Sequence, residues 1–239
     1  MATSDRIHHA DVRTESNCVF DVIKDSRSGR HAVLAHSDIR RAISALQSGP
    51  VSFCRNNVIA CQGDDADYMF MVVSGVVRAC KIFQNGDRAV VAFYLPGDLL
   101  GWCNNTQSLS IEAATNAVVL FFKRRPLVSM AAHNPSLARL LLDLATKELC
   151  RAHEHAALLS RDAKSRVVLF LSELKSRSAG KDRVVLGMSH QDIADHLGLT
   201  IETLSRTITS LERSGAIRRA AGRTLLLRDA WSPLRITLT

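Results

Sequence analysis

Three polar side chains in the C-terminal third of the chain have the types and the spacing needed to read DNA base edges. Glu202, Ser205 and Arg206 are three and one positions apart, so on a helix they share one side. A guanidinium carries two parallel donors that match the O6 and N7 acceptors of guanine, and a carboxylate can accept from the N4 amine of cytosine. The alternative is an ordinary exposed helix in which Glu202 and Arg206 form a weak i,i+4 salt bridge.

The segment around these residues predicts two short helices joined by a turn. The first helix begins after Ser189, a residue favoured at N-caps, and ends at Gly198. The second begins after Thr200, and its apolar positions recur at helical spacing, at Leu204, Ile208 and Leu211. Two helices connected in this way are the helix-turn-helix arrangement, which places the second helix in the major groove.

The chain is basic, and its charge is unevenly distributed. Its 239 residues carry a formal charge of +8, and they are enough for one large domain or two smaller ones. Residues 161–239 contain 14 Lys and Arg against 8 Asp and Glu, whereas residues 1–160 contain 17 against 15. Because the excess lies with the predicted helix-turn-helix, it favours nucleic acid over a membrane surface as the partner.

Other classes of function lack support in the sequence. We find no Walker loop, no nucleophile elbow and no zinc signature, so we expect no enzymatic activity. Residues 1–25 lack the apolar core of a secretory signal, and the apolar run Val118–Phe122 has only the length of a strand. The six cysteines include no Cys-x-x-Cys pair, which is typical of reduced thiols. We therefore expect a cytoplasmic protein without membrane contact.

The N-terminal half has the sequence pattern of an antiparallel β-structure. Residues 1–37 are polar and without a clear period, so they predict an extension that leads into a short helix near Ser37–Leu46. From Val51 to Phe122, short apolar runs alternate with turn-forming residues, which are Ser74-Gly75, Asn85-Gly86 and Pro96-Gly97-Asp98. Several short strands at this spacing suit a jelly roll or a barrel.

A long helical segment follows Pro135, and it carries a heptad-like stripe. The stripe consists of Leu137, Leu141, Leu144, Glu148, Arg151, His155 and Leu158. Such a stripe predicts pairing of the helix with its copy in a second chain. The alternative is a helix packed on its own β-structure, which Leu140 and Leu142 on the neighbouring faces favour. A two-fold dimer would separate two recognition helices by about 34–36 Å and would require a palindromic site.

A predicted hairpin follows the second helix. The run Arg218-Arg219-Ala-Ala-Gly-Arg223 precedes the strand-like Thr224–Leu227. We interpret it as a wing, whose arginines Arg218, Arg219 and Arg223 would contact phosphate oxygens and add affinity without specifying sequence.

These motifs together resemble the Crp/Fnr family of bacterial transcription regulators. The pattern Gln-Asp-Ile-Ala-Asp-x-Leu-Gly-Leu-Thr-x-Glu-Thr-x-Ser-Arg over residues 191–206, followed by Leu-Glu-Arg-Ser-Gly-Ala-Ile over 211–217, is similar to the family's DNA-binding domain. It is most similar to the Fnr and FixK branches. The order of turns from Tyr68 to Gly101 resembles the family's cyclic-nucleotide-binding-type β-roll.

The resemblance implies an α+β fold with a defined order of parts. A β-roll sensor-type domain would occupy residues 38–133, a dimerisation helix 134–160, and a winged helix-turn-helix 161–239. It implies base contacts to a TTGAT half-site by Ile201, Glu202, Ser205 and Arg206. Further phosphate contacts, matched to polar positions of the family motif, would be His190, Gln191, Thr200 and Thr203; each of these could equally be a cap or a solvated side chain.

The resemblance also raises the question of a bound signal, for which we expect no cofactor. The places where a cyclic phosphate would sit read Gly101-Trp-Cys103 and Leu109-Ser-Ile-Glu112, without the arginine that would neutralise it. An iron–sulfur cluster requires four thiolates, yet only Cys18 lies near the N-terminus and none lies near Val118–Leu120. Cys150, His153 and His155 are poorly placed for a metal, because His155 lies well round the helix from Cys150.

Together these expectations describe a FixK-like homodimer that acts without a cofactor. It would bind double-stranded DNA at a TTGAT-N4-ATCAA-like palindrome and recruit RNA polymerase, chiefly as an activator. The resemblance implies control of genes for low-oxygen respiration or nitrogen fixation. The alternatives are a regulator that responds to haem, nitric oxide or another small molecule, and a cyclic-nucleotide-binding regulatory module of an enzyme or channel.

Overall fold

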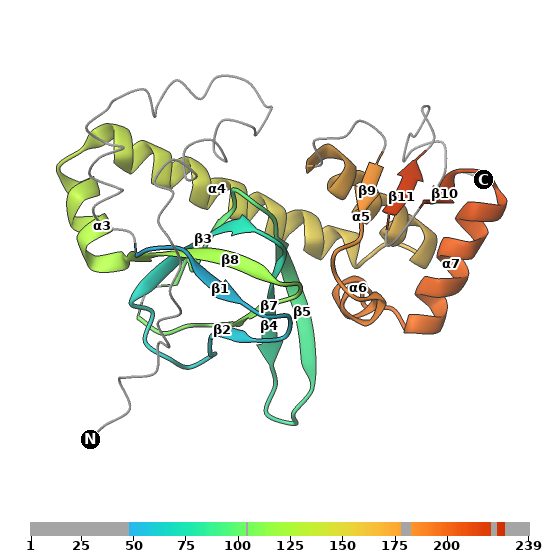
Figure 1. The fold of residues 1–239 in the computed structure, drawn as a ribbon, viewed down its shortest axis with the longest axis horizontal. Coiled ribbons are helices and arrows are strands. Elements are labelled where there is room, and N and C mark those ends of the chain that lie inside the picture. Colours follow the sequence, from blue (N-terminus) through green and yellow to red (C-terminus); the bar gives the residue numbers. More distant parts are fainter. Residues whose placement is uncertain (1–47, 104, 178–182, 221–223, 228–239) are drawn as a thin grey trace.

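The computed structural model describes residues 48–103, 105–177, 183–220 and 224–227. Within these ranges, an antiparallel β-roll is followed by a long helix and then by a smaller domain of helices with a short sheet (Figure 1). The predicted extension at residues 1–37 and the whole of the predicted helix near Ser37–Leu46 lie outside the described residues. The mixed helix and sheet architecture predicted from the sequence is confirmed.

The β-roll consists, in the described part of the chain, of two four-stranded sheets whose neighbouring strands are antiparallel. The first sheet has the order β1 (Val51–Phe53), β8 (Ala117–Lys123), β3 (Tyr68–Ser74) and β6 (Leu99–Leu100). The second has the order β2 (Val58–Ala60), β7 (Ser110–Ala113), β4 (Val77–Ile82) and β5 (Arg88–Tyr94). The predicted turns connect these strands; β4 and β5 form a hairpin around Asn85-Gly86.

Gly75 makes the passage from one sheet to the other possible. It follows β3 with φ +80°, in the left-handed region that side chains with a Cβ rarely adopt. A Cβ placed there would lie 2.2 Å from the carbonyl oxygen of Asn116 and 2.8 Å from the Cα of Ala117. Since both obstacles belong to the backbone, glycine is required at this crossing.

The two faces of β4 serve two different cores. Side chains alternate along a strand, so Val77 and Ala79 point between the sheets and pack with Phe70 of β3. Arg78 and Cys80 point to the opposite face, and both are buried there. The second sheet therefore has two covered faces, and its outer face lies against the C-terminal domain.

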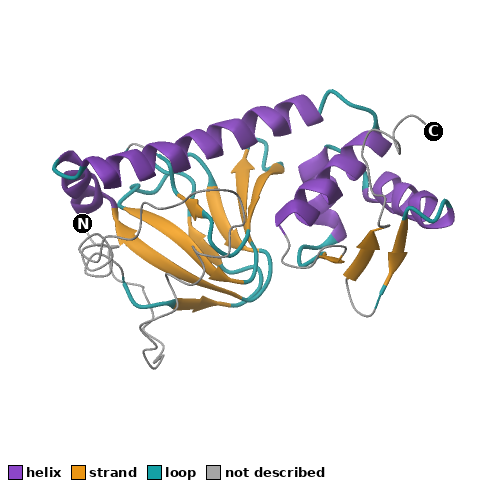
Figure 2. Cartoon of the chain, turned by 90° about the horizontal axis from the view of Figure 1, so that it is seen from above, coloured by secondary structure: helices purple, strands orange, loops and turns teal. Residues whose placement is uncertain are grey.

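The long helix begins at a well-defined cap and runs along one side of the molecule. α4 (Pro135–Leu158) has 24 residues, which corresponds to about 36 Å. The Asn134 side chain accepts a hydrogen bond from the Leu137 amide at 3.0 Å, and Pro135 occupies the first helical position, where its missing N–H costs nothing. Preceded by α3 (Arg124–Ala132), it passes from the β-roll towards the C-terminal domain (Figure 2).

The stripe predicted to pair with a second chain contacts its own protomer. Leu137 is only 1 % exposed and packs with Met69 and Leu127 in the core between the first sheet and the helices. Leu141 packs at the edge of the same core, Leu144 is half-buried, and Leu158 packs against the C-terminal domain. Leu137 is therefore covered within its own protomer, and a dimer contact through the half-buried Leu141, Leu144, Arg151 and Leu158 stays a prediction. Heptad spacing identifies an apolar stripe on a helix, but it does not tell whether that stripe packs against the same protomer or against a second chain.

A neighbouring face of α4, about 100° round the helix from the first stripe, carries a second apolar stripe with the same alternation of four and three residues. Leu142 is 66 % exposed and Leu149 is 56 % exposed, and Figure 2 shows the outer side of the helix uncovered. The stripe consists of Ala138, Leu142, Ala145, Leu149, Ala152, Ala156 and Leu159. Below we call it the outer stripe.

The C-terminal domain contains the predicted helix-turn-helix and hairpin. Its elements are α5 (Ala163–Arg177), β9 (Arg183–Val185), α6 (His190–Leu197), α7 (Ile201–Arg213), β10 (Ile217–Arg219) and β11 (Thr224–Leu227). β11 pairs antiparallel with β10 in the hairpin and with β9, a strand that the sequence pattern did not predict. Leu171, Ile193, Leu204 and Leu211 form the centre of its core.

Candidate nucleic-acid interface

Local capping defines the start of α6 and the turn after it. The Ser189 hydroxyl accepts a hydrogen bond from the Asp192 amide at 3.0 Å and donates to the Asp192 carboxylate at 2.7 Å. Gly198 ends the helix in the left-handed conformation, with φ +59°. The Arg166 guanidinium of α5 donates to the carbonyl oxygens of Leu197 at 2.9 Å and Gly198 at 3.1 Å, which ties the turn to the domain.

The second helix is oriented by its cap and by its apolar face. The Thr200 hydroxyl accepts from the Thr203 amide at 3.2 Å, so Thr200 is the N-cap of α7. Leu204, Ile208 and Leu211 are all buried against the domain, as the spacing predicted. The polar side of α7 must therefore face away from the protein.

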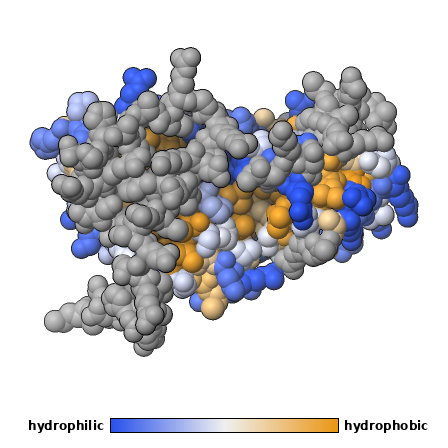
Figure 3. Space-filling model, turned by 45° about the horizontal axis from the view of Figure 1, so that its top comes forward, coloured by the Kyte–Doolittle hydropathy of each residue, from blue (hydrophilic) through white to orange (hydrophobic). Residues whose placement is uncertain are grey.

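The four predicted base-contacting residues lie together on that polar side. Ile201, Glu202, Ser205 and Arg206 are exposed, and they line a common hollow that opens to solvent. The end of the molecule where α7 lies is rich in hydrophilic side chains, drawn in blue at the right of Figure 3. Among the described residues, no ion pair joins Glu202 to Arg206, so the structure does not form the i,i+4 bridge of the alternative interpretation.

The predicted phosphate contacts on the helices divide into two kinds. His190 is exposed at the first position of α6. Gln191 donates from Nε2 to Asp195 at 2.7 Å, and the hydroxyls of Thr200 and Thr203 lie 3.0 Å apart. Gln191, Thr200 and Thr203 therefore hold local structure in the free protein, and a contact with phosphate would be additional.

The wing arginines differ in what they contact. Arg218 is exposed on β10, and Arg219 points to the other face of the strand, where its Nε lies 2.7 Å from Glu212 of α7. Arg223 lies outside the described residues. Of the two described wing arginines, Arg218 is thus the one without an ion pair to Glu212.

Several buried polar residues connect this domain to the β-roll, and the sequence interpretation did not identify them. His196 of α6 lies beneath β5, where its ring contacts Phe93 and its Nδ1–H donates to the Val90 carbonyl at 3.1 Å. Burial lowers the pKa of His196 to about 4, with a smaller contribution from His155. Arg78 was also missed, although an arginine inside the apolar run of β4 is a signal that such a contact exists.

The residues considered for cofactors have other roles. His155 donates from Nε2 to the His196 carbonyl at 2.8 Å, and Cys150 is exposed on α4. Within the described ranges, no group of three or more His, Cys, Asp or Glu residues could hold a metal ion. Glu112 pairs with Arg78 and Arg88 on the outer face of the second sheet, so its charge is directed at the C-terminal domain and is compensated.

A β-roll, a long connecting helix and a winged helix-turn-helix with an exposed polar recognition face define a DNA-binding transcription regulator. The chain matches the cyclic nucleotide-binding domain over residues 50–134 and the Crp-like helix-turn-helix domain over residues 165–231. It belongs to the Crp/Fnr family, and its relatives support a place in the FixK-like branch. This family consists of regulators and not of enzymes.

Relatives and solved structures agree with this assignment. The chain is 44 % identical over 196 residues to the nitrogen fixation regulation protein FixK of Azorhizobium caulinodans, covering 79 % of each chain. It is 38 % identical to FixK of Bradyrhizobium diazoefficiens, covering 75 % of this chain and 78 % of the relative. The structure of FixK2 from Bradyrhizobium japonicum superimposes with a TM-score of 0.75 at 34 % identity, over 79 % of this chain and 96 % of that one. Among the described helices, none has the length and hydropathy to cross a membrane.

Proposed function

We propose that this protein binds a TTGAT-N4-ATCAA-like palindrome as a homodimer and regulates transcription from it. The observation that carries the proposal is the joint exposure of Glu202, Ser205 and Arg206 on α7, in the register that the Glu-x-x-Ser-Arg motif of the Fnr and FixK branches requires. Arg206 would donate to a guanine, Glu202 would accept from a cytosine amine, and Ile201 would pack against a thymine methyl group.

The outer stripe of α4 is the proposed dimer contact. Leu142 and Leu149 lie seven residues apart at equivalent heptad positions, and the alanines of the outer stripe allow two helices to approach closely. Exposed leucines in a regular stripe are costly unless another surface covers them. A second copy of the helix has the matching pattern, and a two-fold axis along the seam would place the two α7 helices on the same side of the dimer.

The physiological assignment rests on the relatives. Proteins of the FixK type are named for the regulation of nitrogen fixation, and another relative, AadR of Rhodopseudomonas palustris, is named a transcriptional activatory protein at 34 % identity. We therefore propose a cytoplasmic activator of nitrogen-fixation or low-oxygen genes that recruits RNA polymerase. We further propose that it binds DNA without a ligand, because its sequence lacks the phosphate-binding arginine and the clustered N-terminal cysteines.

A binding titration tests the proposal. Full-length protein purified in air is titrated into a labelled duplex carrying TTGAT-N4-ATCAA and into a scrambled duplex, each at two salt concentrations. Tight binding to the palindrome alone supports a cofactor-independent regulator. Equal binding to both duplexes would refute it, and an absorption spectrum of the same sample would then show whether a haem or cluster is present.

A further inference from the structure

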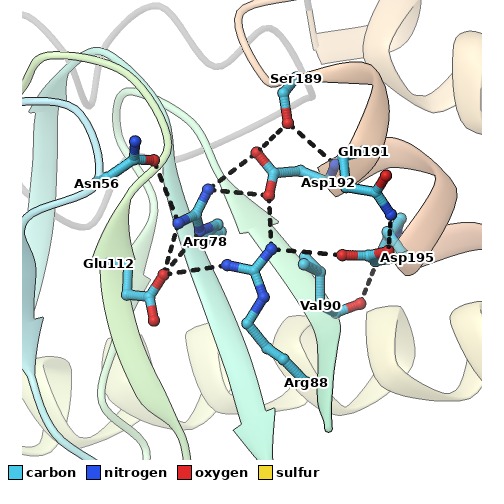
Figure 4. Close-up of polar contacts among 10 residues, drawn as sticks. Asn56, Arg78, Arg88, Val90, Glu112, Ser189, Gln191, Asp192 and Asp195 are labelled. Carbon is cyan, nitrogen blue, oxygen red and sulfur yellow. Dashed lines mark hydrogen bonds and ion pairs between the residues drawn. The ribbon is translucent and has the colours of Figure 1, made fainter.

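A buried ion network joins the β-roll to the first helix of the helix-turn-helix. Arg78 of β4 is 5 % exposed, and its Nη1 donates to both carboxylate oxygens of Asp192 at 2.9 Å. Its Nε and Nη2 donate to Glu112 at 2.9 and 2.7 Å, and Nη2 also reaches the side-chain oxygen of Asn56 at 3.3 Å (Figure 4). One guanidinium therefore binds a carboxylate from each of the two domains.

Arg88 of β5 reinforces the same link from a more exposed position. Its Nη2 donates to Asp192 at 3.1 Å and to Asp195 at 3.3 Å, and its Nη1 lies 3.5 Å from Glu112. Figure 4 shows both arginines pointing from the sheet towards the start of α6. Charge-assisted bonds with defined geometry specify an orientation as well as contributing energy.

Asp192 binds Ser189 in the first turn of α6 and Arg78 of the β-roll, and its carboxylate is ionised in both contacts. It is 2 % exposed and closes the first turn of α6 through its bonds with Ser189. Burial alone would raise the pKa of Asp192, but the Ser189 hydroxyl and the charges of Arg78 and Arg88 outweigh burial and hold the pKa below its usual value. At neutral pH the carboxylate is ionised, so the link between the domains is permanently charged.

Apolar contacts surround the network and make the junction stiff. Cys80, Val90 and Phe93 of the β-roll belong to the same buried core as Ile193 and Leu197 of α6. Close-packed interiors resist displacement. The orientation of α6 therefore follows that of β4 and β5, and the Arg166 bonds to the turn transmit it to α7.

The junction leaves the reading face free. With the network formed, Glu202, Ser205 and Arg206 remain exposed. The contact between the domains therefore does not cover the side chains proposed to read the bases.

We propose that Arg78 is a positioning residue for DNA recognition. Through Asp192 it holds α7 at one place relative to the β-roll and α4, and so it sets the spacing between half-sites that the dimer accepts. This inference rests on the proposed palindrome binding. A change of one base pair in the spacer moves a half-site by about 3.4 Å along the duplex and turns it by about 35°. A rigid dimer cannot engage both half-sites after such a change, whereas a loosened one can.

The experiment measures spacing preference with the full-length protein. Dissociation constants are determined for duplexes with spacers of three, four and five base pairs and for a duplex with one TTGAT half-site. The variants are Arg78→Gln, Arg78→Lys and Arg88→Gln. Arg78→Lys retains a buried cation but loses the forked contact with two carboxylates, and Arg88→Gln alters a more exposed site, so both disturb the junction less than Arg78→Gln; circular dichroism checks that each variant is folded. Arg125→Met, an exposed arginine of α3, is the matched control.

We expect the wild type and Arg125→Met to prefer the four-base-pair spacer by more than about tenfold. In folded Arg78 variants the preference falls below about threefold, and Arg88→Gln shows an intermediate loss, while affinity for the single half-site stays within about twofold. An unchanged preference in Arg78→Lys and Arg88→Gln would overturn the inference, as would a wild type that binds all three spacers equally. A wild type that does not bind the palindrome at all would instead refute the proposed function.

Discussion

The imidazole rings of His155 and His196 are stacked in parallel, with 4.1 Å between their centroids and 1° between their planes. His155 comes from α4 and His196 from α6, and His196 also donates to the Val90 carbonyl of β5. The pair thus lies where the long helix, the β-roll and the DNA-binding domain meet. Burial lowers the pKa of His196, so its imidazole is neutral at physiological pH.

The free energy of unfolding should therefore decrease at acidic pH, because His196 is protonated more readily in the unfolded chain. The pKa of His196 is about 4 in the folded protein, against about 6.5 in an unfolded chain. Between these values the unfolded chain binds more protons, so the free energy of unfolding falls as pH decreases from about 6.5 to 4, by at most about 3 kcal/mol. Urea unfolding at several pH values measures this loss in the wild type.

His196→Asn is the test of that assignment. Carboxylates also titrate below pH 5, so the informative quantity is the difference in pH dependence between the wild type and the variant. We expect the variant to lose most of the dependence between pH 6.5 and 5. His153→Asn, an exposed histidine of α4, should behave like the wild type. An identical pH dependence in His196→Asn would show that His196 does not titrate with a lowered pKa.

A charge on the outer stripe should separate the dimer. Leu149→Lys would place two ammonium groups in an apolar seam, where desolvation and like-charge repulsion both oppose association. Sedimentation equilibrium should then find a monomer that remains folded. Val128→Lys adds the same charge at an aliphatic residue of α3 that is 55 % exposed, and it should leave the dimer intact. A dimeric Leu149→Lys protein would mean that the protomers associate elsewhere.

Leu137 should stabilise the protomer and not the dimer seam. Leu137→Ala leaves a cavity between the first sheet and α4, so we expect it to lower the free energy of unfolding by about 2–5 kcal/mol. Val128→Ala, at an exposed position, should change it by less than about 0.5 kcal/mol. The two variants are compared by chemical denaturation at one protein concentration. A loss as small in Leu137→Ala as in the control would contradict the burial described above.

Arg206 of α7 should determine the sequence specificity of DNA binding, whereas the wing should contribute only affinity. Arg206→Ala should cost about 1–3 kcal/mol on the palindrome and almost nothing on scrambled DNA, because a bidentate base contact is lost. Arg213→Ala, an exposed arginine in the last turn of α7, is the control and should retain discrimination. Titration of both duplexes with both variants measures the effect. If Arg206→Ala still distinguished the palindrome from scrambled DNA as well as the wild type does, Arg206 would not be a base-contacting residue.

Replacing Arg218 and replacing Arg219 should change the salt dependence of DNA binding by different amounts. Arg218→Ala removes an exposed cation, so the slope of log K against log salt should decrease by about one per protomer for every sequence. Arg219→Ala should have a smaller effect, since Arg219 is already paired with Glu212 in the free protein. Equal slopes for Arg218→Ala and the wild type would indicate that Arg218 does not contact phosphate.

The helix-turn-helix could be predicted from the sequence in detail, because local rules define it. Ser189 and Thr200 cap the helices that follow them, Gly198 ends α6 in the conformation that glycine favours, and Leu204 begins the buried face of α7. The strands of the β-roll were predictable for a similar reason, since alternation and turn residues act over a few positions. The exposure of Glu202 and Arg206 then follows directly from the helical period.

The contacts between domains were decided only by the tertiary structure. Arg78 and Asp192 are 114 positions apart, and no local pattern couples them. The sequence also could not decide which stripe of α4 the β-roll covers, because α4 has two apolar faces with the same heptad spacing. Local spacing is a property of a single helix or strand, whereas the partner of each face depends on how all the elements pack together.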